Sequence, residues 1–253
     1  MENVLSGGNT HEEVVRVDDT VRRPTGPWTP GVHALLVHLQ QKGFDGAPRV
    51  HGIDERGREV LGYIEGEVVH PDHVDRIESD EALAEVARVI RRFHDAASSF
   101  TESRAHVWSD RGSDPAGPNE ILCHNDLAPW NLVRSGEGRW VFIDWDLAAP
   151  GRRSWDLAWA LLSLVPLMPV SDLDDVRTRQ RIAVFRSSYG VGEFPEDVLS
   201  VAVERCRREA DLIYRLGSAG EMPYVRLLAE GHGEIWSAAA THIASRSSGW
   251  YAS

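Results

Sequence analysis

The sequence predicts an α+β protein, in which a short β-rich N-terminal part precedes a longer and mainly helical part. Short runs rich in β-branched residues, separated by turn residues, fill roughly the first 65 positions. From about residue 79 onward, apolar residues recur at helical spacing over long stretches. Between these patterns, a polar loop within residues 121–133 is followed by an apolar run that leads into Asp144. These three observations organise the chain.

Composition excludes several classes of protein. The chain has 253 residues, of which 42% are hydrophobic and 26% are charged, as in globular proteins. A net charge of −12 disfavours nucleic acid or an anionic membrane as a partner. We see neither an apolar run of membrane-spanning length nor a secretory signal, and the two cysteines lack a disulfide pattern. We therefore expect a cytoplasmic protein that binds neither nucleic acid nor membrane, and its oligomeric state is left open.

The N-terminal part begins with a predicted hairpin. Residues 14–17 and 20–23 read as strands around a tight turn at residues 18–19. Because alternate residues of a strand share a face, Val21 and Arg23 are expected to point the same way. The stretch before the hairpin contains Ser6, Gly7 and Gly8. Glycines there would let backbone amides approach a phosphate closely, and a plain turn is the alternative interpretation.

A helix and two further strands complete this part. Residues 30–42 form the predicted helix, with Thr29 as its N-cap and a proline at its first position. Residues 48–53 and 59–64 read as two strands around a turn, and the second ends in Tyr63 and Ile64.

The remainder reads as helices around the polar loop. Residues 79–97 carry an apolar stripe and a serine cap, which predict an amphipathic helix. A loop at residues 98–119 follows, and four more helices are predicted after the polar loop. Those helices cover about residues 156–165, 173–189, 195–217 and 224–245.

The polar loop carries the residue types that phosphoryl transfer requires. His124, Asp126 and Asn131 form the pattern H-x-D-x-x-x-x-N, and Asp144 follows Asn131 by thirteen residues. The reaction needs a carboxylate for the acceptor hydroxyl and hard oxygen ligands for Mg²⁺. We assign Asp126 as the catalytic base and Asn131 and Asp144 as the metal ligands. His124 is expected to brace the loop by hydrogen bonds.

Three short motifs resemble those of the aminoglycoside phosphotransferase family. They are Asp126-Leu-Ala-Pro129, Ile143-Asp-Trp145 and Asp156-Leu-Ala158. This family is a small-molecule branch of the protein-kinase-like fold. The resemblance implies a bilobal structure. Residues 1–66 would form a nucleotide-binding N-lobe, and residues 67–253 would form a helical C-lobe with the catalytic loop, the metal strand and the acceptor pocket.

The resemblance also implies ATP or GTP as a co-substrate together with Mg²⁺. Ser6, Gly7 and Gly8 would then cover the phosphates, and Val21 would contact the adenine. Tyr63 and Ile64 would form the hinge at the edge of the adenine, and an ordinary strand end is the alternative interpretation. Asp156 would cap a helix and brace the catalytic loop.

One pair of residues departs from the family pattern. Arg23 stands where the family carries a phosphate-binding lysine, so we assign the phosphates to Arg23. The helix that normally offers a glutamate partner has only Val32 and His33 at that place. The usual Lys–Glu pair is therefore missing on both sides.

Two functions from different classes remain open. The first is an O-phosphotransferase that transfers the γ-phosphate to a hydroxyl of a small molecule, such as an aminoglycoside-like antibiotic. The second is a kinase-fold immunity or binding protein with little catalysis, which the missing Lys–Glu pair supports and the complete set of Asp126, Asn131 and Asp144 opposes. A protein kinase is disfavoured because residues 150–158 leave no room for an activation segment.

Overall fold

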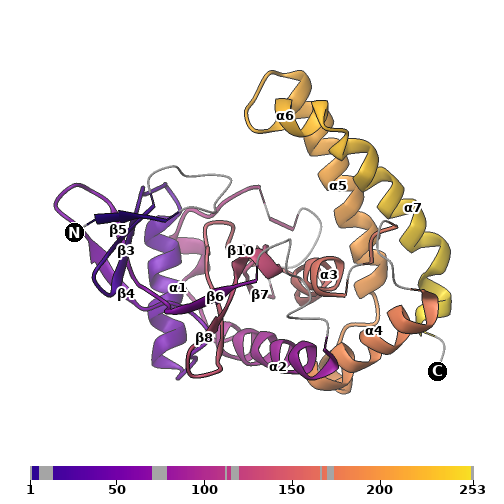
Figure 1. The fold of residues 1–253 in the computed structure, drawn as a ribbon, viewed down its shortest axis with the longest axis horizontal. Coiled ribbons are helices and arrows are strands. Elements are labelled where there is room, and N and C mark those ends of the chain that lie inside the picture. Colours follow the sequence, from indigo (N-terminus) through magenta and orange to yellow (C-terminus); the bar gives the residue numbers. More distant parts are fainter. Residues whose placement is uncertain are drawn as a thin grey trace. The chain divides into compact units, whose positions relative to one another are not determined.

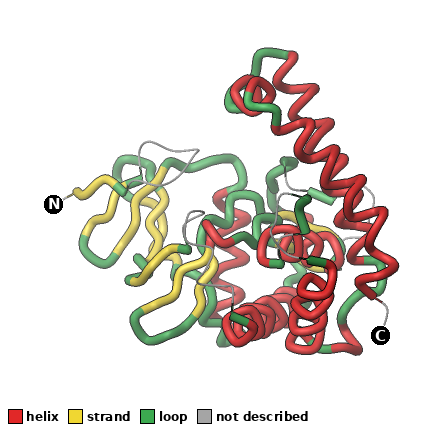
Figure 2. Tube along the Cα trace, turned by 45° about the vertical axis from the view of Figure 1, so that its right-hand side comes forward, coloured by secondary structure: helices red, strands yellow, loops and turns green. Residues whose placement is uncertain are grey.

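The computed structural model describes residues 2–5, 14–69, 79–111, 113–114, 120–165, 167–169 and 174–251. The chain divides into two compact units, Met1–Arg153 and Ser154–Ser253. All the strands that are described lie in the first unit, and the second unit is built from helices (Figure 2). The predicted α+β class, with a β-rich start and a helical remainder, is confirmed. The division into lobes at residue 66 stays a prediction.

A five-stranded antiparallel sheet opens the first unit. Its strands are β1 (Glu2–Val4), β2 (Val15–Val17), β3 (Thr20–Arg23), β4 (Val50–Ile53) and β5 (Glu59–Gly62), in the order β1-β2-β3-β5-β4. The turn between β2 and β3 places Asp18 at a φ of 52°, a left-handed conformation that aspartate tolerates better than most residues. The predicted hairpin and the two later strands are therefore present.

Helix α1 (Thr29–Gln41) packs beside this sheet, against β4 (Figure 1). Its buried stripe of Val32, Leu35, Leu36 and Leu39 has the helical spacing seen in the sequence. The predicted N-cap was wrong by one residue. Trp28 is the N-cap, whereas Thr29 lies inside the helix, where its hydroxyl accepts a hydrogen bond from the Gly26 amide at 2.9 Å.

Two small sheets frame the polar loop. Strand β7 (Ile121–Cys123) pairs with β10 (Ala149–Gly151), and β8 (Leu132–Ser135) lies between β6 (Gly66–Val68) and β9 (Trp140–Phe142). The loop leaves β7 and enters β8, while Asp144 follows the end of β9. Helix α2 (Asp80–Ala97) packs against β7 and β9, so it supports both the strand that leads into the loop and the strand that leads to Asp144.

The second unit contains the C-terminal helices. They are α3 (Arg153–Leu164), which begins at the boundary, α4 (Asp175–Tyr189), α5 (Val198–Ser218), α6 (Tyr224–Ala229) and α7 (His232–Tyr251). Helices α5 and α7 run side by side (Figure 1). The single helix predicted from residue 224 is divided by Gly231, whose φ of 78° is not helical.

The core of the second unit contains a buried arginine among aromatic rings. The Arg205 guanidinium lies 4.7 Å from the centre of the Trp155 ring and 4.5 Å from that of Trp159, and it donates a hydrogen bond to the Trp155 carbonyl at 3.0 Å. This charge is therefore stabilised within the helical unit. Across the described residues, no helix combines the length and the hydropathy needed to cross a membrane.

Candidate active site

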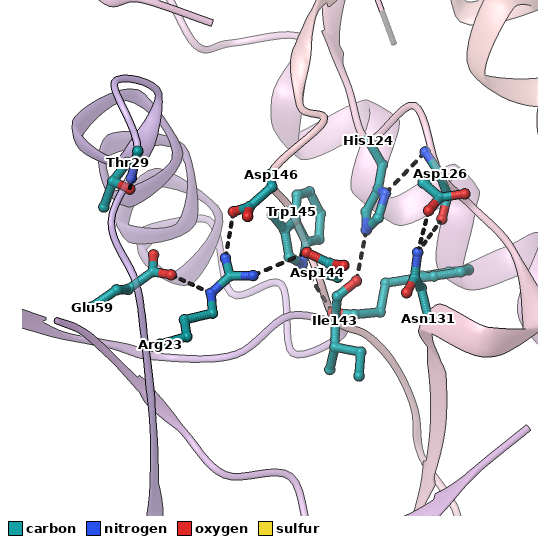
Figure 3. Close-up of polar contacts among 12 residues, drawn as sticks. Arg23, Thr29, Glu59, His124, Asp126, Asn131, Ile143, Asp144, Trp145 and Asp146 are labelled. Carbon is teal, nitrogen blue, oxygen red and sulfur yellow. Dashed lines mark hydrogen bonds and ion pairs between the residues drawn. The ribbon is translucent and has the colours of Figure 1, made fainter. Parts of the chain in front are cut away.

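Asp126 and Asn131 hold each other within the polar loop (Figure 3). The Asn131 Nδ2 group donates one hydrogen bond to Asp126 Oδ2 at 2.7 Å and another to the Asp126 carbonyl at 3.1 Å. These bonds fix the orientation of the Asp126 carboxylate. They use the nitrogen of the Asn131 amide, which leaves its oxygen as the atom suited to a metal.

His124 ties the loop to the segment after β9. The imidazole is fully buried, and its Nε2 lies 3.2 Å from the Ile143 carbonyl, while the Asp126 amide donates to its Nδ1 at 3.3 Å. This arrangement requires Nε2 to carry the proton. The Ile143 amide in turn donates to the Asn131 carbonyl at 2.8 Å. The amide and the carbonyl of Ile143 thus join the polar loop to the segment that follows β9.

Asp144 directly follows that residue. Its φ of 59° is left-handed, a rare conformation for a residue with a side chain, and its side chain is 41% exposed. The oxygens of Asp144 and Asn131 suit Mg²⁺, which is bound in nucleotide sites by one or two protein side chains together with phosphate oxygens and water. Such a site needs few protein ligands. Among the described residues, no cluster of three or more His, Cys, Asp or Glu could by itself hold a metal.

Arg23 lies beside Asp144 and connects it to the sheet. The side chain is largely buried, and each of its three nitrogens faces a different carboxylate (Figure 3). Nε donates to Glu59 Oε2, Nη1 donates to Asp144 Oδ1 at 2.9 Å, and Nη2 donates to Asp146 Oδ1 at 2.7 Å. Burial lowers the pKa of Arg23, but the charges of Asp146, Glu59 and Asp144 outweigh it and the net shift is upward.

Glu59 continues this network to α1. It is 1% exposed, and its Oε1 lies 2.9 Å from His33 Nε2. Burial raises the pKa of Glu59, yet the hydrogen bond from His33 and the charge of Arg23 bring the net shift below the ordinary value. The pKa of Asp146 is raised, chiefly by burial, because Asp144 and Glu59 add to that effect and Arg23 only partly opposes it.

The contacts of Arg23 are what the sequence interpretation missed. The usual Lys–Glu pair is absent, and its place is taken by a chain of contacts from His33 through Glu59 and Arg23 to Asp144. A signal existed, because Arg23 and Glu59 are directly opposite each other in the β3–β5 register. Opposite charges at facing positions stabilise a sheet. The sequence alone does not show that β3 pairs with β5, so the contact between Arg23 and Glu59 could not be predicted from it.

The remaining predicted site residues are placed as follows. Val21 lies on β3 opposite Leu61, two residues before Arg23. The Tyr63 amide donates to the Asp19 carbonyl at 2.8 Å, and the Arg16 guanidinium lies 3.8 Å from the centre of the Tyr63 ring. An adenine that used the Tyr63 amide would have to displace this bond. Ile64 comes shortly after β5, and its assignment to the hinge stays a prediction.

Two other predicted elements are less informative. The phosphate loop of Ser6, Gly7 and Gly8 lies outside the described residues, although β1 and β2 on either side of it are paired. Asp156 lies fully buried in the first turn of α3, within the second unit. Its predicted role in bracing the loop stays a prediction.

Comparison with known proteins supports the family resemblance. Residues 101–187 match the model of APH, described as the phosphotransferase enzyme family. The resemblance to this phosphotransferase family is confirmed. The matched segment contains the whole polar loop and Asp144, so the residues that carry the sequence motifs lie inside it.

Three known proteins are similar to this chain in sequence or in structure. A trifolitoxin immunity protein from Rhizobium leguminosarum bv. trifolii is 41% identical over 161 residues, so the match spans 62% of this chain and only 59% of that relative's length. A spectinomycin phosphotransferase, solved with ADP and spectinomycin, has a TM-score of 0.63 at 10% identity, covering 96% of this chain and 92% of that one. A choline/ethanolamine kinase family protein from Mesorhizobium loti has a TM-score of 0.61 at 14% identity, covering 91% and 87%. These two structures confirm the protein-kinase-like fold.

Proposed function

We propose that this protein is an O-phosphotransferase that uses Mg²⁺ with ATP or GTP and transfers the γ-phosphate to a hydroxyl group of a small molecule. The main support for the proposal is that Ile143 joins the polar loop to the segment that carries Asp144. The carbonyl of Ile143 binds His124 and its amide binds the Asn131 carbonyl. These hydrogen bonds link the backbone of Asp126 and Asn131 to the segment that carries Asp144, which supports the three residues acting together in phosphoryl transfer.

Each side chain has a distinct part in this reaction. Asp126 accepts the proton of the acceptor hydroxyl as the hydroxyl oxygen bonds to the γ-phosphorus and the bond to the leaving diphosphate breaks. Asn131 keeps the Asp126 carboxylate in place through its Nδ2 group. The oxygens of Asn131 and Asp144 would hold Mg²⁺, which when bound neutralises charge on the phosphates. His124 keeps the backbone of the loop against Ile143.

The test is nucleoside diphosphate release across a panel of hydroxylated small molecules that includes aminoglycosides and choline-like alcohols. We expect at least one acceptor to stimulate release, and we expect Asp126→Ala to abolish that stimulation. Trp130→Phe is a matched control, because Trp130 belongs to the same loop and donates only a long 3.4 Å bond to Asp126. Full stimulated activity in Asp126→Ala would contradict the proposal.

A second function is favoured by one comparison. The relative that is 41% identical is named an immunity protein, which supports a role in protection against a toxic molecule. Protection by phosphorylation and protection by sequestration differ in their use of nucleotide. If protection in cells survives Asp126→Ala and Asp144→Asn, the protein acts as a binder. If both variants lose protection while the purified proteins remain folded, the protein acts as a phosphotransferase.

A further inference from the structure

The Asp144 carboxylate already has a positively charged partner in the protein itself. Arg23 donates to Asp144 Oδ1 and to Asp146 Oδ1, at 2.9 and 2.7 Å. The guanidinium group is planar, so the two carboxylates lie along its outer edge while Glu59 contacts the nitrogen nearest the chain. Figure 3 shows the guanidinium between the three carboxylates.

This position differs from that expected of a phosphate ligand. The Arg23 side chain is 8% exposed and the Asp144 side chain is 41% exposed, so the carboxylate is open to solvent and the guanidinium is not. Glu59 is buried and is held in turn by His33, which anchors Arg23 from its buried side. All three side-chain nitrogens of Arg23 therefore face carboxylates, and a metal ion at Asp144 would lie close to the positive charge of Arg23.

We propose that Arg23 is the internal counter-cation of the Asp144–Asp146 pair, positioned by Glu59 and His33, and that it keeps metal affinity low until nucleotide phosphates are present. The inference rests on the proposed function only in taking Asp144 as the metal ligand. Like charges in proximity oppose binding, so the guanidinium weakens the attraction of Asp144 for a divalent cation. Phosphate oxygens would add negative charge and restore that attraction. Arg23 is thus a positioning residue for the metal rather than a ligand of the phosphates.

The test measures binding of Mn²⁺ alone, without nucleotide, by calorimetry and by electron paramagnetic resonance. The central variant is Arg23→Met combined with Glu59→Gln, which removes one positive and one negative charge and so preserves the net charge. The amide introduced at position 59 retains a polar group for His33. We expect Mn²⁺ to bind the double variant at least tenfold more tightly than the wild type, and adding Asp144→Asn should remove this gain.

Two controls separate the charge of Arg23 from other effects. Glu59→Gln alone keeps the guanidinium, and Arg23→Lys keeps a positive charge, so neither should gain Mn²⁺ affinity. A gain in either control equal to that of the double variant would refute the role of Arg23 as counter-cation. A double variant that binds Mn²⁺ no better than the wild type would also refute it, provided that Arg23→Gln with Glu59→Gln, as a second folded variant, gives the same result.

The measurement is independent of catalysis. A protein that releases no nucleoside diphosphate with any acceptor can still show the gain in Mn²⁺ affinity, in which case the proposed function fails and the role of Arg23 stands. The converse result, turnover without the gain, would leave the phosphotransferase in place and overturn only the role of Arg23.

Discussion

Glu59→Gln tests whether the buried network beside the site stabilises the fold. Glu59 is buried and accepts one bond from Arg23 and one from His33. A hydrogen bond to a charged group contributes about 1.5–3 kcal/mol and a neutral one about 0.5–1.5 kcal/mol, so weakening the two bonds together costs about 2 kcal/mol. At about 2–4 °C per kcal/mol for a protein of this size, the melting temperature should fall by about 4–8 °C.

The control for this substitution is Glu137→Gln. Glu137 is 76% exposed and pairs with Arg139 at 2.9 Å, and an exposed ion pair contributes about 0–1 kcal/mol. Both variants and the wild type would be unfolded by heat and by urea, with circular dichroism as the signal. If Glu59→Gln is destabilised no more than Glu137→Gln, the buried network does not contribute as we argue.

The pH dependence has a defined sign. The pKa of Glu59 in the folded protein lies below its ordinary value of 4.5. Its charge therefore stabilises the fold above that value, and this stabilisation is lost as the pH falls through the folded pKa. The difference in unfolding free energy between wild type and Glu59→Gln should shrink as the pH falls below about 4.5. A difference that grows as the pH falls below that value would contradict this reasoning.

Three further substitutions give separate outcomes. Asn131→Asp places a carboxylate against Asp126 Oδ2, where a donor lies at 2.7 Å, so stimulated turnover should fall by about 10²-fold or more relative to the wild type. His124→Phe keeps the buried ring but loses two hydrogen bonds, so urea unfolding should show a loss of about 1–3 kcal/mol. Arg205→Met removes a cation from the Trp155 ring, which should destabilise the second unit by about 2 kcal/mol and alter tryptophan fluorescence. Wild-type behaviour in any of these assays would remove the role given to that residue.

The elements that the sequence predicts well are those whose signals are local. The helix at α2 has its serine cap, whose side chain accepts from the Ala82 amide at 3.1 Å, and its apolar stripe is buried. The spacing of Asp126 and Asn131 also reflects a local turn, because Pro129–Asn131 forms a short 3-10 helix within the loop. Such features depend only on residues that are close together in the chain, so they can be predicted from the sequence.

The environment of Arg23 depends instead on distant pairings. Glu59 and Asp144 reach it from positions 36 and 121 residues away in the sequence. Strand alternation indicates which face Arg23 occupies, but it defines no register between β3 and β5 and no position for the segment after β9. The family resemblance led us to assign Arg23 to the phosphates, whereas its described contacts are with carboxylates that only the distant pairings bring near.

The three-carboxylate environment of Arg23 also constrains which substitutions this lineage or a protein engineer can make. A lysine has one compact ammonium on a flexible stem, so it cannot reproduce the planar fork that satisfies Glu59, Asp144 and Asp146 at once. Arg23→Lys alone would keep a positive charge beside these carboxylates, but it could not donate to all three of them at once. The geometry of the three contacts therefore restricts position 23 to arginine.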